Sequence, residues 1–139
     1  MVLLLQFCFN KFPLHVLIPP SPGVLQSPGF PSNYPNNLDT TDTIEGPEGS
    51  ILRLTFTHFN IESDFSCRYD YIRIDEWNGS SLLGKSCGTS LPPALHSSGS
   101  AVRVIFHTDR TRTRSGWSLS WAALTPGTGP HCRNIAPEP

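Results

Sequence analysis

Charged side chains are scarce in this chain. Asp, Glu, Lys and Arg make up 15 % of its 139 residues, against a usual share of about 25 %. The formal net charge is −1. Proteins that bind nucleic acid through its phosphates need a strongly basic face. We therefore expect no nucleic-acid partner.

The common catalytic motifs are missing as well. The sequence has no Gly-x-Ser-x-Gly, no His-Glu-x-x-His and no glycine-rich phosphate loop. It has no Cys-x-x-Cys, and its histidines show no ligand spacing, so a zinc finger or a thioredoxin-like motif has little support. We predict that the chain is not an enzyme.

No apolar run is long enough to span a membrane. Residues 1–22 are apolar, but Asn10 and Lys11 interrupt them, and no basic residue precedes the run. No small-residue cleavage site follows. This segment is either an atypical secretory signal or the remnant of a truncated gene model. We expect no membrane span in it.

Cysteines number only four, and two of them lie within the patterned part of the chain. Cys67 and Cys87 are the inner pair, whereas Cys8 and Cys132 lie in the flanks. An extracellular disulfide is the interpretation we favour for the inner pair, and it would contribute about 3 kcal/mol in the chain-entropy model. The alternative is two buried free thiols.

Short stretches of alternating polarity are present from residue 23 onwards. Turn signals rich in Gly, Pro, Asn and Ser separate them, and no amphipathic helix is evident. This pattern predicts an all-β protein, an antiparallel two-sheet β-sandwich of the jelly-roll type. We expect the domain to cover 23–122, with 123–139 as a linker or the start of a following module. The alternating stretches are 52–56, 69–74, 102–107 and 117–121.

Three carboxylates are placed where a fold of this kind could bring them together. Glu62 and Asp70 stand on either side of Cys67, and Asp109 ends a predicted strand. Calcium takes several oxygen ligands at about 2.3–2.6 Å. Without a cation, clustered carboxylates repel and raise one another's pKa. We hypothesise a Ca²⁺ site, against the alternative of three unrelated surface carboxylates.

The order of several motifs resembles the CUB domain, an extracellular β-sandwich module of complement-initiating proteases, tolloid-type proteinases, cubilin and spermadhesins. The resemblance covers roughly 23–122. Its pieces are SPGFPSNYPNN at 27–37, GPEGSILRLTFTHFNIE at 46–62, CRYDYIRI at 67–74, LLGKSCG at 82–88, SSGSAVRVIFHTD at 97–109 and SGW at 115–117.

The resemblance departs from the family pattern at its first disulfide. The family's first cysteine, just ahead of Gly23, is missing. Its second cysteine would fall at Thr40, and a tryptophan would follow at Asp42. In lacking the whole bridge, the chain is similar to the first CUB domains of complement-initiating proteases. The loss leaves Cys8 without a family partner.

The resemblance also implies a calcium-binding subtype and a ligand set. Glu62, Asp70 and Asp109 match the family's acids, Tyr34 matches its tyrosine, and Thr111 would offer a backbone carbonyl. Arg112 stands where some relatives have an asparagine ligand. Around the ion, the acids of related modules receive a lysine or arginine from a partner protein. Three other acids match no ligand position and are expected to be solvated: Asp64, Asp75 and Glu76.

Two surface features carry further hypotheses. Arg110, Arg112 and Arg114 alternate beside Asp109, which suits either a glycosaminoglycan or a solvated hairpin tip that screens the carboxylates. Asn78-Gly-Ser is a glycosylation sequon in a predicted turn.

The function we predict is a secreted or extracellular, calcium-dependent module that binds a Lys- or Arg-bearing protein at Tyr34, Glu62 and Asp109. The alternatives are a non-catalytic targeting arm of a secreted protease, a carbohydrate- or glycosaminoglycan-binding protein like the spermadhesins, and a structural spacer.

Overall fold

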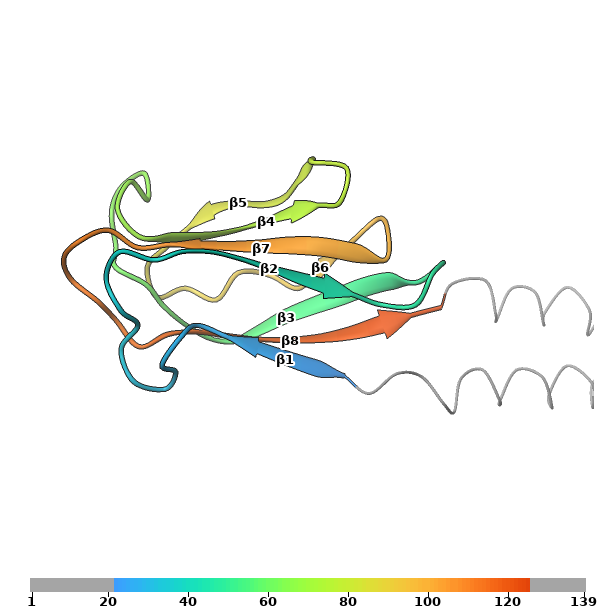
Figure 1. The fold of residues 1–139 in the computed structure, drawn as a ribbon, viewed down its shortest axis with the longest axis horizontal. Helices are drawn as coiled ribbons and strands as arrows, with labels where there is room; N and C mark the ends of the chain where they lie inside the picture. Colours follow the sequence, from blue (N-terminus) through green and yellow to red (C-terminus); the bar gives the residue numbers. More distant parts are fainter. Residues whose placement is uncertain (1–21, 126–139) are drawn as a thin grey trace, which may run out of the picture.

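The computed structural model describes residues 22–125, which form eight strands and no helix (Figure 1). The expected N-terminal segment and most of the expected linker, with Cys8 and Cys132, lie outside the described residues. The strands are β1 (Gly23–Gln26), β2 (Asp39–Glu45), β3 (Ile51–Asn60), β4 (Tyr71–Glu76), β5 (Ser81–Ser86), β6 (Leu95–His96), β7 (Ala101–His107) and β8 (Gly116–Leu124).

The strands make two four-stranded antiparallel sheets that pack face to face. One sheet has the order β1-β8-β3-β6 and the other β2-β7-β4-β5. Consecutive strands often lie in different sheets, so their connections cross from one layer to the other. The protein is an all-β sandwich, and the fold class predicted from the sequence is confirmed.

The core lies between the two sheets and follows the alternation in the sequence. Leu52, Leu54 and Phe56 of β3 are buried, whereas Arg53 between them is exposed. Because successive side chains of a strand point to opposite faces, one face of each strand reaches the core. The equivalent inward positions of β4 and β7 are buried too: Ile72, Ile74, Val102, Val104 and Phe106.

One expectation about the strands needs correction, and a second holds in part. The alternation from Tyr69 predicts a strand that begins there, but β4 begins at Tyr71 because Tyr69 and Asp70 lie in a bend. The alternation in 117–121 places Trp121 in the core with Trp117. Trp117 is fully buried, and Trp121 is partly buried and packs against the core, with its indole over Gly23.

Three loops gather at one end of the sandwich, on the left in Figure 1. They connect β1 to β2, β3 to β4, and β7 to β8. The register places their roots together, because Asp39 and Tyr71 both pair with His107, and Asn60 pairs with Gly116. This end of the sandwich therefore collects residues that are far apart in sequence.

Residues 22–125 contain no helix that could span a membrane.

Candidate metal centre

Glu62, Asp70 and Asp109 converge at this end of the sandwich. One carboxylate oxygen from each lies within 4.8 Å of the others, and Glu62 and Asp70 are buried. Glu62 follows a bridge in which Ile61 and Gly88 exchange two backbone hydrogen bonds of 2.9 Å. Asp70 directly precedes β4, and Asp109 lies just beyond the end of β7. Three separate segments thus supply one acidic cluster.

Tyr34 lies beneath the acidic cluster and joins two of its members. Its side chain is 1 % exposed. The phenol donates a hydrogen bond to Asp70 Oδ2 at 2.7 Å and accepts one from the backbone N–H of Glu62 at 3.0 Å. Because both bonds are buried, the tyrosine fixes the position of Asp70 relative to the chain at Glu62.

Backbone donors hold the two aspartates. Asp70 Oδ1 accepts a hydrogen bond from the N–H of Asp109 at 2.8 Å, and Asp109 Oδ1 accepts one from the N–H of Thr111 at 3.1 Å. The role expected for the Thr111 carbonyl as a further ligand stays a prediction. Each carboxylate keeps lone pairs beyond those bonds, since an ionised carboxylate offers about four acceptor positions.

Hydrogen bonds join the β1–β2 loop to the β7–β8 loop, which carries Asp109 of the acidic cluster. The N–H of Tyr34 donates to the carbonyl of Arg114 at 3.0 Å, and the N–H of Asn37 donates to the carbonyl of Asp109 at 2.8 Å. The buried hydroxyl of Thr108 donates to the carbonyl of Pro35 at 2.9 Å.

The local environment disfavours negative charge on the buried acids. Burial is the main cause that raises the pKa of Glu62, and the charges of Asp70 and Asp109 add to it, while Arg112 and Arg114 lower it in part. Burial also raises the pKa of Asp70, although hydrogen bonds from Asp109 and Tyr34 oppose the rise. The pKa of Tyr34 is raised, chiefly by burial. A cation at the cluster would relieve this repulsion.

The donor set fits calcium. Glu62 Oε1 is buried and has no hydrogen-bond partner among the described residues, which is costly for a carboxylate unless a cation compensates it. Calcium binds carboxylate oxygens at about 2.3–2.6 Å, so oxygens on opposite sides of an ion lie about 5 Å apart. One carboxylate oxygen from each member of the cluster lies within 4.8 Å of the others, which matches this separation. The donors are all oxygens, which suits a hard cation.

The raised pKa values predict an unusual pH dependence of stability without calcium. Because Glu62 and Asp70 titrate higher in the folded state than in the unfolded chain, the folded state binds more protons in that interval. Lowering the pH from about 7 towards 4.5, the ordinary pKa of glutamate, should therefore raise the melting temperature in EDTA. In saturating calcium the trend should reverse, since protons then compete with the ion. Melting curves across this range in both conditions test it, and equal slopes would contradict it.

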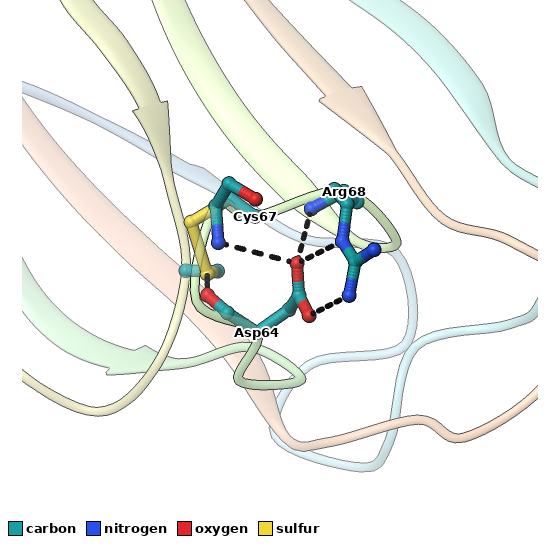
Figure 2. Close-up of polar contacts among 5 residues, drawn as sticks. Asp64, Cys67 and Arg68 are labelled. Carbon is teal, nitrogen blue, oxygen red and sulfur yellow. Dashed lines mark hydrogen bonds and ion pairs between the residues drawn. A yellow bond between two sulfur atoms is a disulfide. The ribbon is translucent and has the colours of Figure 1, made fainter.

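Cys67 and Cys87 form a disulfide, the inner pair expected from the sequence. The bond ties the β3–β4 loop to the segment that follows β5. It lies beside a clamp formed by Asp64 and Arg68 (Figure 2). Asp64 Oδ2 accepts hydrogen bonds from the N–H and the Nε–H of Arg68 at 2.9 and 3.0 Å, and Oδ1 accepts one from Nη2 at 3.0 Å.

The expectation that Asp64 is simply solvated is therefore wrong. Its side chain is only 9 % exposed. The hydrogen bonds from Arg68, followed by the one from Ser66 N–H, hold the pKa of this carboxyl well below its usual range. An aspartate at the start of a tight turn often accepts bonds from the backbone that follows it. That local turn signal was present in the sequence, whereas the family's ligand positions carry no information about this residue.

Glu76 is a second correction, because it is 8 % exposed where solvation was expected. Its Oε2 accepts hydrogen bonds from the N–H and the hydroxyl of Ser98. Asp75 is partly exposed and pairs with Arg73 at 3.3 Å. Glu76 lies at the far end of β4 from Asp70, where a cavity of about 220 Å³ is lined in part by Glu76, Trp77 and Ser98. The Glu76 carboxylate therefore joins the end of β4 to the β6–β7 connection.

The predicted arginine cluster and the sequon are both at the surface. Arg110, Arg112 and Arg114 lie on the β7–β8 loop, and all three are exposed. Arg112 and Arg114 lie near enough to Glu62 to lower its pKa. This favours the screening role considered for them. Asn78 is exposed in the β4–β5 turn, and its Oδ1 accepts hydrogen bonds from the N–H and the hydroxyl of Ser80.

Two histidines contact a serine or an aspartate, the residue types of a catalytic triad, but the two pairs are separate. His58 Nε2 lies 2.8 Å from Ser115 Oγ, and His107 Nδ1 lies 2.6 Å from Asp39 Oδ1. His58 packs against Phe30 and His107 stacks on Tyr71. A nucleophile, a base and an orienting acid do not come together at either pair within 22–125.

Comparison with known proteins gives a consistent result. The family model described as "CUB domain" matches residues 16–121. Rat cubilin is 30 % identical over 119 residues, which is 86 % of this chain and 3 % of cubilin. The chain thus spans only a small part of this relative's length.

Two solved structures share the fold. The full extracellular region of zebrafish Gpr126/Adgrg6 matches with a TM-score of 0.69 at 29 % identity, covering 76 % of this chain and 14 % of that one. The MASP-1 CUB2 domain bound to Ca²⁺ matches with a TM-score of 0.67 at 32 % identity, covering 73 % of this chain and 91 % of that one.

Proposed function

Because this chain belongs to the CUB family, we propose that it is an extracellular module that binds a partner protein through a calcium-ordered face. The observation that carries the proposal is the convergence of Glu62, Asp70 and Asp109, with a buried and unpartnered carboxylate oxygen on Glu62. One solved relative is an extracellular region, and another is a CUB domain bound to Ca²⁺. A disulfide also suits an oxidising compartment.

The ion would be held by the carboxylates of Glu62, Asp70 and Asp109, with the Tyr34 phenol orienting Asp70 from below. Calcium supplies positive charge that neutralises the clustered acids and draws their loops together. Extracellular calcium modules often bind with a Kd of about 10⁻⁴–10⁻³ M, so such a site would be filled outside cells.

The partner group we propose is the ammonium of lysine or the guanidinium of arginine. Three carboxylates and one divalent ion leave a net negative charge, and Asp109 is partly exposed at the rim. Carboxylate oxygens that bind the ion keep lone pairs, which can accept charge-assisted hydrogen bonds. Catalysis has no part in this proposal. The sequon at Asn78, at the far end of β4, is proposed as a glycan site that leaves this face free.

A pair of small probes tests the basic-group preference. N-acetyl-lysine amide should shift the backbone resonances of Asp109 and Thr111 in calcium, and its affinity should be at least about tenfold weaker in EDTA. N-acetyl-norleucine amide, which lacks the ammonium, should cause no shift. Shifts of the same size with both probes, or with lysine in EDTA, would contradict the proposal.

A further inference from the structure

The loop of residues 63–69 presents two aromatic side chains to solvent. Phe65 has a relative exposure of 103 %, so nothing in the described structure covers it, and Tyr69 is 41 % exposed. Single apolar residues at a surface are common and need no explanation. This case differs because the loop that carries Phe65 is held by hydrogen bonds and a disulfide.

The loop that carries Phe65 is fixed at several points. Asp64, directly before it, accepts hydrogen bonds from the N–H groups of Ser66 and Arg68 at 3.3 and 2.9 Å. The N–H of Cys67 donates to the carbonyl of Asp64 at 3.1 Å, and the disulfide to Cys87 anchors the same turn. Figure 2 shows the clamp of Asp64 and Arg68 with Cys67 beside it. A fixed loop loses little conformational entropy on binding.

The same loop runs between two members of the acidic cluster. Glu62 precedes it and Asp70 follows it, and the Cα of Phe65 can lie at most about 11 Å from that of Glu62, because the two are about three residues apart along the chain. A partner that places a basic side chain at the acidic cluster therefore comes within reach of Phe65.

We propose that Phe65 is the apolar anchor of the partner-binding face and enters an apolar pocket that the partner carries beside its lysine or arginine. This inference rests on the proposed function, which supplies the basic side chain. Aromatic side chains that fill pockets carry much of the energy of protein interfaces. Tyr69, with Arg68 stacked 5.1 Å from its ring centroid, extends the same loop surface.

Selection of peptides tests the inference with the full 139-residue chain. Random peptides displayed on phage are bound in millimolar calcium and eluted with EDTA. We expect the selected peptides to combine Lys or Arg with a large apolar residue. Their affinity for Phe65→Ser should fall at least about tenfold, as expected for a hot-spot residue. Val24→Ser is the matched control, because Val24 is 62 % exposed on β1, away from this loop. It should bind like the wild type.

The outcomes separate this inference from the proposed function. Peptides that elute with EDTA but bind Phe65→Ser like the wild type would overturn the anchor and leave the calcium-dependent face intact. Peptides that stay bound in EDTA, or an empty selection, would overturn both. Two further outcomes would overturn the anchor. One is dimerisation of the chain in sedimentation that Phe65→Ser abolishes, and the other is binding to phosphatidylserine vesicles that the same variant abolishes. Phe65 would then contact a second copy of the chain or a membrane surface.

Discussion

Replacing Glu62 by glutamine is expected to change stability in opposite directions with and without calcium. In EDTA the melting temperature of Glu62→Gln should rise by a few degrees, because about 1 kcal/mol shifts the midpoint of a domain of this size by roughly 4–8 °C. In saturating calcium the variant should lose the stabilisation that the wild type gains. That gain is about 2.7 kcal/mol when free calcium is about 100 times Kd.

The physical reason is the position of this carboxylate. Glu62 is 6 % exposed, and its Oε1 has no hydrogen-bond partner among the described residues. Glutamine keeps the shape, removes a buried charge beside Asp70 and Asp109, and brings an N–H group that can donate to them. The same change removes a negative ligand, which should weaken calcium binding by about 100-fold.

Glu45→Gln is the matched control, because Glu45 is an exposed carboxylate at the end of β2 away from the cluster. It should leave the free energy of unfolding in both conditions within about 0.5 kcal/mol of the wild type, as surface substitutions usually do. A Glu62→Gln protein that melts lower in EDTA than the wild type would show that Glu62 is not held in an unfavourable charged environment.

Replacing Gly116 by alanine is expected to cost about 3 kcal/mol or more of folding free energy. Gly116 opens β8 with φ +90°, and a Cβ there would clash with Ser27 Oγ and would meet Ser27 Cβ at 2.9 Å. Ser27 cannot turn away freely, since its hydroxyl accepts a hydrogen bond from the N–H of Trp117 at 3.0 Å. The melting temperature should fall by roughly 15 °C.

Gly79→Ala measures the cost of a positive φ without a steric clash, and is the matched control for Gly116→Ala. Gly79 also has a positive φ of 95°, but a Cβ there would meet nothing within 4 Å. Alanine at this position should therefore cost only about 1 kcal/mol. Equal losses for the two variants would mean that the contact with Ser27 relaxes.

The sheets could be predicted from sequence because their signal is local. Leu52, Leu54 and Phe56 alternate with polar residues, and burying one face of a strand requires that period. The turn at Asn78-Gly79 is equally local. The start of β4 could not be predicted, because alternation through Tyr69 and Asp70 does not reveal that Asp70 is bound from the side by Tyr34 and Asp109.

The acidic cluster could be anticipated only in part. The sequence shows that Glu62, Asp70 and Asp109 lie near predicted strand ends, but only the sandwich topology brings those ends together. The bonded side chains of Asp64 and Glu76 were not predicted, because their partners come from a tight turn and from the β6–β7 connection. Such pairings depend on loop geometry, which carries no periodic signal in the sequence.

Calorimetric titration of the purified 139-residue chain with calcium tests the calcium site most directly. We predict saturable binding with a Kd of about 10⁻³ M or tighter, lost in Asp109→Ala and retained in Asp75→Ala, which removes a carboxylate outside the cluster. Absence of binding by the wild type, or the same affinity in Asp109→Ala, would contradict the proposed site and leave the three carboxylates without a metal-binding role.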